Sequence, residues 1–286
     1  MKKGIKIILW ILGAILFILL AAIIWFNLPY SPMKNQFEKL VDSQTEKMHF
    51  GDEVFTLEDI AELPVPVQKH FQYCGYIGQK KMSNMKIHFR DVDFILSPME
   101  NKLKIDYTQF NVADEPVRFA IIDTGIFGIP FEGLDTFIDG QGSMKGVIGK
   151  AITIFDEKGE SLSRATLVTC LAESLLIPSF ATNDFIVWEE IDDTNVKATI
   201  SYHGISASGI FTFDENGAMK SFTTDDRENV DANGNVQKVR WSAIIEDYKE
   251  KDGIKYPTSM KAIWHYDSGD VVYFDGKDFE IEYDYK

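Results

Sequence analysis

The chain has 286 residues, of which 45% are hydrophobic, 13% aromatic and 26% charged. This length fits one or two domains, and the apolar content is too high for a disordered chain. Three of the 29 basic residues precede a long apolar run, so residues 27–286 carry 26 basic and 44 acidic groups, a formal balance of −18. A domain this acidic argues against nucleic acid as a partner and against direct docking on anionic headgroups.

An uncharged apolar run, Ile7 to Phe26, dominates the N-terminus. As a helix rising about 1.5 Å per residue, a run of this length spans the roughly 30 Å hydrocarbon core of a bilayer. Lys2, Lys3 and Lys6 predict a cytoplasmic N-terminus. The segment Ala21–Trp25 offers no spaced pair of small residues for cleavage, so an uncleaved anchor is favoured over a cleaved export signal. The expected location is the cell membrane, single-pass, with an extracytoplasmic C-terminal domain.

Three segments follow from this pattern. They are a cytoplasmic tip and transmembrane anchor over residues 1–26, a stalk over 27–55 and an extracytoplasmic β-rich domain over 56–286. Two prolines end the membrane helix, and the mixed-charge stretch Lys34–Lys47 indicates a short exposed helix within the stalk. At the start of the domain, a capping-box pattern at Thr56 opens a helical turn, and helical spacing of apolar residues predicts a helix over Pro66–Tyr73.

From Asn84 onward the apolar period changes from helical spacing to two, which predicts strands. Turn-rich breaks separate these strands, so antiparallel neighbours are expected. The first group is carried by Ile87, Phe89, Val92, Phe94 and Leu96, then Leu103, Ile105 and Tyr107, then Val117, Phe119 and Ile121. The second group covers 184–191, 196–202, 206–213, 219–224, 236–248, 258–266 and 271–283, with a hairpin turn at 231–235 among its breaks.

One broad apolar helix is predicted between the two strand groups, over Ser161–Ile177, and Pro178 ends it. A lone buried helix among long strands must cover a sheet. The predicted fold class is therefore α+β, mainly antiparallel β: a curved open or half-closed barrel with one packed helix, preceded by short helices and an N-terminal transmembrane helix. The glycine-rich stretch Phe131–Met144 is expected to supply tight bends and close strand contacts rather than to place Asp135 or Asp139 near a ligand.

Several short motifs are spread over residues 60–286, each weak alone and specific only as a set. They comprise Leu63, Pro64 and Val67; Phe131, Gly133, Asp135, Gly140, Gly142 and Met144; Leu171, Ala172, Glu173, Ile177 and Pro178; Trp188, Ile191, Asp192 and Asp193; Phe213, Asp214, Gly217 and Arg227; and Trp241, Asp247, Tyr248, Asp252, Gly253, Pro257 and Trp264. This set resembles a bacterial family of the DUF6920/DUF6544 type, a domain of unknown function. The resemblance implies a bacterial source and assigns no functional residue. Thr169 and Cys170 depart from its pattern, which often has a basic residue and then an aromatic one.

Glu173 is the leading candidate for a ligand contact, because apolar neighbours leave only a narrow polar edge on its helix. Its carboxylate is expected either to form a partly buried ion pair, with Arg227 as a candidate partner, or to contact a ligand. The tryptophans of the domain, Trp188, Trp241 and Trp264, are expected either to anchor the core or to line a pocket. These five residues form the predicted ligand-binding set.

Metal and nucleophile chemistry has little support in the sequence. The five histidines are scattered without an H-E-x-x-H pattern, and Gly204–Gly209 fails the G-x-S-x-G elbow. Residues 231–235 are not followed by the glutamate that closes a calcium loop. Cys74 and Cys170 form no C-x-x-C motif and either pair or stay as two buried thiols, which is the favoured alternative. No catalytic residue, metal or cofactor is predicted.

Two function classes are carried forward. The favoured one is a non-catalytic extracytoplasmic module that binds an apolar or amphipathic molecule, a lipid or cell-envelope component, in the concavity of the sheet, with the bilayer as partner of the N-terminal helix. The alternative is a cell-envelope hydrolase or isomerase that uses Glu173 and neighbouring acids. A third class is a structural domain that binds a protein partner and whose concavity is filled by side chains. The interior of the sheet discriminates among them.

Overall fold

The computed structural model describes residues 2–95, 102–230 and 236–286. The helices are α1 (Lys2–Asn27), α2 (Pro32–Thr45), α3 (Val65–Cys74), α4 (Glu160–Ala172) and α5 (Pro178–Ala181), with a 3-10 turn η1 (Ser174–Leu176). The strands are β1 (Asn84–Phe94), β2 (Leu103–Val112), β3 (Arg118–Ile126), β4 (Ile129–Ile138), β5 (Gln141–Ile148), β6 (Ile152–Lys158), β7 (Ile186–Glu190), β8 (Asn195–Tyr202), β9 (Ile205–Phe213), β10 (Met219–Thr224), β11 (Glu228–Val230), β12 (Val236–Lys238), β13 (Arg240–Lys251), β14 (Ile254–Tyr266), β15 (Gly269–Lys277) and β16 (Glu280–Tyr283).

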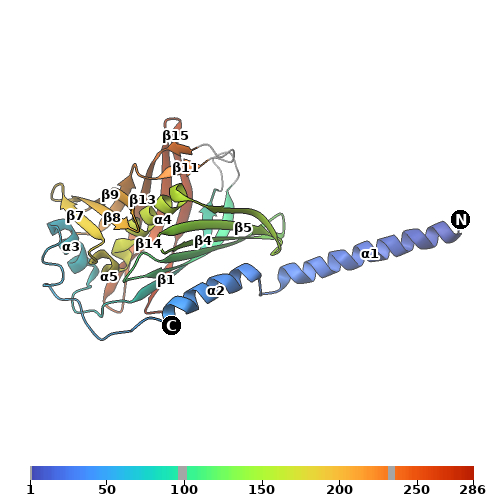
Figure 1. Ribbon diagram of the computed structural model, residues 1–286, viewed down its shortest axis with the longest axis horizontal. Helices are drawn as coiled ribbons and strands as arrows, with labels where there is room; N and C mark the ends of the chain where they lie inside the picture. The colour runs from blue at the N-terminus through green and yellow to red at the C-terminus, as the bar shows by residue number, and fades with distance from the viewer. Residues whose placement is uncertain (1, 96–101, 231–235) are drawn as a thin grey trace.

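A single curved sheet of 14 strands forms the body of the molecule (Figure 1). Its order is β6-β5-β4-β3-β2-β1-β15-β14-β13-β10-β9-β8-β7, and β16 also pairs with β1. Each of the strand pairings is antiparallel. Among the described residues β6 and β7 are its free edges, so the sheet is curved but not closed. The predicted fold class is confirmed.

The two faces of the sheet bury different clusters, as the period of two along each strand dictates. On β1, Met85, Ile87 and Phe89 point to the inner face and belong to the large core, whereas Lys86 and His88 point outward. The same alternation on β3 sends Ala120 and Ile122 inward and Phe119 and Ile121 outward. Each face therefore needs its own cover.

Helix α4 covers the inner face, where its apolar side chains join the large core. It contacts β5 and β4 on one side and β9 and β8 on the other, so it bridges the two halves of the curved sheet (Figure 1). The close approach requires a glycine on β5: a Cβ on Gly142 would lie 2.8 Å from the Cα of Ser163. The amide of Gly142 instead donates to Ser163 Oγ at 2.8 Å. The glycine-rich stretch thus makes a close contact with a helix, whereas the sequence predicted close contacts between strands.

The single helix expected over Ser161–Ile177 is divided in the structure. Helix α4 ends at Ala172, and the chain tightens into η1 before α5 begins at Pro178. A proline disfavours helical geometry in the residue before it, and Ile177 is extended with φ −124°. The prediction was correct about the covering helix and wrong about its length.

Strands β4, β5 and β6 cover the stretch from 129 to 158, for which the sequence predicted tight bends and close strand contacts at Phe131–Met144 but no strands of its own. Most of the other predicted strands are observed, with 236–248 and 271–283 each interrupted, as β12 and β13 and as β15 and β16. The predicted helix near Pro66 is α3, closed by Gly75 at φ 75°. Leu96 and the turn at 231–235 lie outside the described residues.

Helix α2 packs on the outer face and is not the exposed helix expected for the stalk. Ser31 caps it through a hydrogen bond from the Lys34 amide, and its buried residues Met33, Phe37 and Val41 join Phe119 and other outward side chains. Each of these three residues is at most 4% exposed. The helix that follows α1 is therefore part of the folded domain, while the segment boundaries themselves stay a prediction.

Candidate functional site

Glu173 lies at the C-terminal end of α4, and its carboxylate points to the inner face of β2 and β3. Arg118 on β3 donates two hydrogen bonds to it, from Nε to Oε2 at 2.9 Å and from Nη2 to Oε1 at 3.0 Å. Asn111 Nδ2 donates a third, to Oε2 at 2.9 Å. Arg118 is 4% exposed and Glu173 5%. The partner suggested from the sequence, Arg227, is wrong, because the paired strands bring Arg118 to this position instead.

The ion pair continues into a buried polar network on β2. Arg118 Nη2 also donates to the Tyr107 hydroxyl at 2.5 Å, and Gln109 Nε2 donates to Asn111 Oδ1 at 3.1 Å. Burial alone would lower the pKa of Arg118, but the charge of Glu173 raises it well above its ordinary value. A carboxylate that accepts three such bonds is held in place by the network. The geometry favours the ion pair that fixes α4 on the sheet.

Arg227 belongs to a second group on the same face. Its guanidinium carbon lies 4.6 Å from the ring centre of Trp241 and 5.5 Å from that of Trp264, and its Nη1 donates to Thr169 Oγ1 at 2.7 Å. The two tryptophans are directly opposite each other on β13 and β14. Two tryptophan rings and a hydroxyl thus hold a cation against α4. Three of the five predicted site residues are brought together here.

Asp135 on β4 lies within electrostatic range of both groups. Burial raises the pKa of its carboxyl to about 6, while the charges of Arg118 and Arg227 act in the opposite direction. Its Oδ1 has no hydrogen-bond partner. The period of two along β4 places Asp135 on the inner face with Phe131 and Phe137. An acidic residue between inward aromatic residues is the sequence pattern that could have identified it.

Trp188 lies apart from these groups, on β7 at the edge of the sheet. Its Nε1 donates to the carbonyl of Ala181 at 3.0 Å, and its ring centre is 5.2 Å from that of Phe211. The contacts are those of a tryptophan that anchors α5 against the sheet.

Packed side chains occupy the inner face around these polar groups. The large core includes residues of α3, α4, η1 and α5 together with the inward side chains of β1, β8, β9 and β13. Cys74 and Cys170 are free, buried thiols within it, as favoured from the sequence. Within the residues that the structure describes, three or more His, Cys, Asp and Glu side chains nowhere gather in a geometry that would hold a metal ion. The concavity in which a ligand was expected is thus packed.

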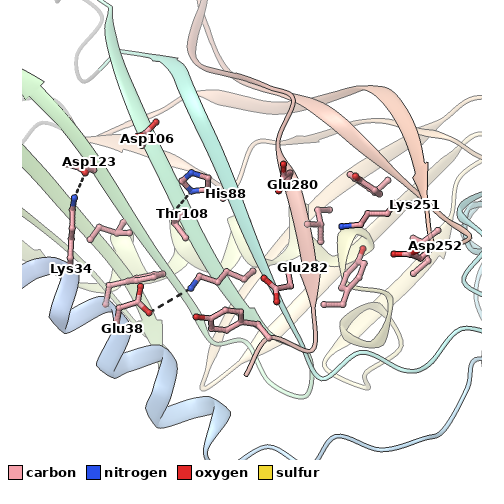
Figure 2. Close-up of a pocket in the computed structure, with 18 residues that line it drawn as sticks. Lys34, Glu38, His88, Asp106, Thr108, Asp123, Lys251, Asp252, Glu280 and Glu282 are labelled. Carbon is pink, nitrogen blue, oxygen red and sulfur yellow. Dashed lines mark hydrogen bonds and ion pairs between the residues drawn. The ribbon is translucent and has the colours of Figure 1, made fainter. Parts of the chain in front are cut away.

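A groove of about 840 Å³ lies instead on the outer face (Figure 2). Helix α2 forms one wall, the outward residues of β1 and β2 form the floor, and β16 with the β13–β14 turn forms the other wall. Its apolar lining residues are Phe37, Ile121, Ile254, Tyr256, Ile281, Tyr283 and Tyr285. Its polar lining residues are Lys34, Glu38, Lys86, His88, Asp106, Thr108, Asp123, Lys251, Asp252, Glu280 and Glu282.

The groove lies where two strands of the sheet separate. The described pairings of β14 join Ile254–Pro257 to β13 alone, and pairing with β15 begins only at Ser259. Strand β16 pairs with β1. The facing edges of β14 and β16 are therefore not joined by ladder hydrogen bonds, which leaves room beside α2. Sequence reasoning missed this feature because it arises from strand pairing and from the docking of α2.

Acidic groups outnumber basic ones along the groove, with six carboxylates and three lysines among the lining residues. Lys34 forms an ion pair with Asp123, and Lys86 Nζ lies 3.9 Å from Glu38 Oε2 (Figure 2). His88 Nδ1 and Thr108 Oγ1 share a hydrogen bond of 2.8 Å on the floor. The remaining carboxylates, including Asp106, leave the groove net negative.

Two solved structures resemble this chain loosely in fold. A LolA superfamily protein from Nitrosomonas europaea aligns at 13% identity over 76% of this chain and 91% of its own, with a TM-score of 0.39. A DUF1329 family protein from Desulfovibrio piger aligns at 11% identity over 77% of this chain and 94% of its own, with a TM-score of 0.41. Superpositions this loose carry no argument about function. No curated protein matches the sequence.

The family profile extends over most of the domain just described. It begins before α3 and ends in β15, and so includes the sheet apart from β16, together with α4 and the Glu173–Arg118 pair. It covers the motifs that first indicated a relationship. With residues 53–276 matched, the chain belongs to DUF6544, a family of unknown function.

Proposed function

We propose that this protein is a single-pass membrane protein of the cell envelope whose extracytoplasmic domain binds an amphipathic ligand in the outer-face groove. The observation that carries the proposal is the groove itself, which combines apolar and aromatic side chains with polar ones in about 840 Å³. Sites for small molecules commonly enclose roughly 300 to 1,000 Å³ and join apolar walls to a few polar groups. The groove replaces the packed concavity as the expected site.

The charges of the groove restrict the ligand class. Six carboxylates face three lysines, and two of those lysines, Lys34 and Lys86, already have acidic neighbours in Asp123 and Glu38. An anionic headgroup would meet net repulsion here, whereas a neutral, zwitterionic or cationic polar group would not. Phe37 and Ile121 on one side and Tyr256 on the other would contact the apolar part.

The position of the groove supports a ligand that comes from the membrane. Among the described residues, one N-terminal helical segment is long and apolar enough to cross a bilayer, with a mean hydropathy of 3.2 in its most apolar window and no part of that window buried. Lys34 on the wall of the groove lies in the first turn of α2, which begins at Pro32, shortly after the end of α1 at Asn27. A lipid or envelope component at the surface would therefore lie near the groove.

The enzyme alternative draws no support from Glu173. Its carboxylate is engaged by Arg118 and Asn111 under α4, on the face opposite the groove. Binding without chemistry accounts for the groove more directly.

Native mass spectrometry of the full chain in detergent tests the proposal, with lysophosphatidylethanolamine and lysophosphatidylglycerol as probes. We expect a one-to-one adduct with the zwitterionic probe and a weaker one with the anionic probe. Thr108→Trp on the groove floor should abolish the adduct, and Thr199→Trp, an outward threonine on β8, should not. An adduct that survives Thr108→Trp, or the lack of any adduct with the parent chain, would overturn the proposal.

A further inference from the structure

Two hairpin turns expose apolar side chains at one end of the sheet. Between β3 and β4, Phe127 is 102% exposed and Ile129 38%. Phe127 and Gly128 both have positive φ, 51° and 80°, so the tight turn projects the phenyl ring away from the sheet. After the β5–β6 turn, Ile152 and Ile154 on the edge strand are 65% and 53% exposed. Apolar side chains gathered in this way mark an interaction surface.

The β5–β6 turn contacts the end of α1, and the β3–β4 hairpin packs beside that turn, where the Gly149 amide donates to the carbonyl of Pro130 at 2.7 Å. Trp25 Nε1 donates to the carbonyl of Gly149 at 2.9 Å, and Lys150 Nζ donates to the carbonyl of Leu28 at 2.5 Å. A Cβ on Gly149 would lie 3.4 Å from the ring of Phe26 and 3.9 Å from Ile129. In Figure 1 the ends of β4 and β5 accordingly lie beside the junction of α1 and α2. The turns are thus at the same level as the end of the apolar helix.

The composition of the two turns differs from that of the rest of the domain. Residues 125–130 and 148–154 contain no carboxylate, although residues 27–286 carry 44. Their one charged residue is Lys150, which is 6% exposed and turned toward backbone carbonyls of the anchor. Acidic groups would be repelled by anionic lipid and are costly to dehydrate, so their absence suits a surface that leaves water.

We propose that the β3–β4 and β5–β6 turns insert Phe127, Ile129, Ile152 and Ile154 into the outer leaflet beside α1. The inference rests on the proposed function in one respect, namely that α1 crosses the membrane. Apolar side chains at the headgroup and acyl boundary bind by burial of area and need no anionic lipid. The insertion fixes the orientation of the sheet. Asp123, at the wall of the groove, is then four residues from the membrane along β3, roughly 13 Å at the rise of a strand.

Lipid-depth quenching of the full chain in phosphatidylcholine vesicles tests this inference. A polarity-sensitive dye is attached to Phe127→Cys, since the native thiols are buried, and doxyl-labelled lipids serve as quenchers. We expect the emission to shift to shorter wavelength and to be quenched. The matched control is Val187→Cys, an exposed apolar residue on β7 that should be neither shifted nor quenched. Addition of phosphatidylglycerol should leave both results unchanged.

A third label separates the two proposals. Leu16→Cys, within α1, reports whether the anchor is in the bilayer. Quenching at position 16 without quenching at 127 would overturn the insertion of the turns and leave the anchored protein intact. The absence of quenching at position 16 would overturn the anchor itself and with it both proposals. Quenching at 127 that requires phosphatidylglycerol would also overturn the apolar mode of contact.

Discussion

At the scale of single residues, the inner face holds charges that a β-rich core ordinarily excludes. Arg118 and Glu173 are both nearly inaccessible, and each satisfies the other in a bidentate pair. A buried pair of this kind adds little net stability over apolar residues of the same size, but loss of one partner leaves an uncompensated charge in the core. The pair therefore fixes the position of α4 relative to β3.

Glu173→Ala should destabilise the protein by about 3 to 5 kcal/mol, because the Arg118 guanidinium would stay buried without its counter-charge. Glu173→Gln, which keeps a hydrogen-bond acceptor, should cost less. The control is Arg240→Ala, which removes an exposed pair with Asp225 and should cost below about 1 kcal/mol. Urea unfolding of the full chain in detergent measures all three. A Glu173→Ala variant as stable as Arg240→Ala would show that the pair does not hold the helix.

Two further buried groups should shape the pH dependence of stability in opposite directions. Burial lowers the pKa of His70 from 6.5 to about 4, against the hydrogen bond that its Nδ1 donates to Gly217. The unfolded chain binds that proton more readily, so His70 makes stability rise as pH increases from about 4 to 6.5. Burial raises the pKa of Asp135 from 3.8 to about 6, so Asp135 makes stability fall over nearly the same interval.

Because the contributions of His70 and Asp135 nearly cancel, together they should change the free energy of unfolding of the parent chain little between pH 4 and 6.5. Asp135→Asn should remove the falling contribution and leave a profile that rises with pH, with a gain of about 3 kcal/mol at pH 7. Thermal unfolding at a series of pH values measures this. Asp267→Asn, at the exposed β14–β15 turn, is the control and should keep the parent profile. A profile for Asp135→Asn that is parallel to the parent would contradict the assignment.

At the scale of elements, α2 links the anchor, the outer core and the groove. Its apolar side faces Phe119 and Ile121, and its polar side supplies Lys34 and Glu38 to the groove wall. A mixed-charge helix after a membrane span is easily taken for a stalk, because its apolar residues are few. Their burial becomes evident only when the outward residues of β3 are known to need a cover.

Phe37→Ala in α2 should cost about 3 to 5 kcal/mol, since the ring is 2% exposed and its loss leaves a cavity in the outer core. Lys39→Ala, on the exposed side of the same helix, should change stability by no more than about 0.5 kcal/mol. The comparison uses the same unfolding measurement for both variants. Equal and negligible effects would mean that α2 does not belong to the folded domain.

Local patterns in the sequence predicted the elements more successfully than the contacts between them. The alternation along β1 and the apolar repeat of α4 depend on neighbouring residues, and both were recognised. Strands β4 and β5 were missed because glycines such as Gly133, Gly142 and Gly146 interrupt their alternation where other side chains approach. The partner of Glu173 depends on which strand lies beneath α4, and the groove depends on the separation of β14 from β16. Neither property has a local signal.

At the scale of the whole molecule, the apolar helix α1 is integrated with the domain rather than loosely tethered to it. Trp25 and Lys150 connect the end of α1 to the β5–β6 turn, and Ser31 opens α2 directly afterward. Cleavage after Phe26 would remove Trp25 and with it the contact to Gly149. Residues that cleavage of an export signal would remove therefore make structural contacts with the domain.

The last prediction concerns the membrane topology of the chain, which depends on α1. Lys2, Lys3 and Lys6 precede the apolar run and should retain the N-terminus in the cytoplasm, so the domain and Lys286 should lie outside. A reporter that is active only in the cytoplasm should be silent when fused after Lys286 and active when fused before Met1. N-terminal sequencing of the membrane fraction should find the chain intact. Reporter activity at the C-terminal fusion, or a mature protein that begins after Phe26, would contradict the orientation and remove the basis for placing the hairpin turns at the outer leaflet.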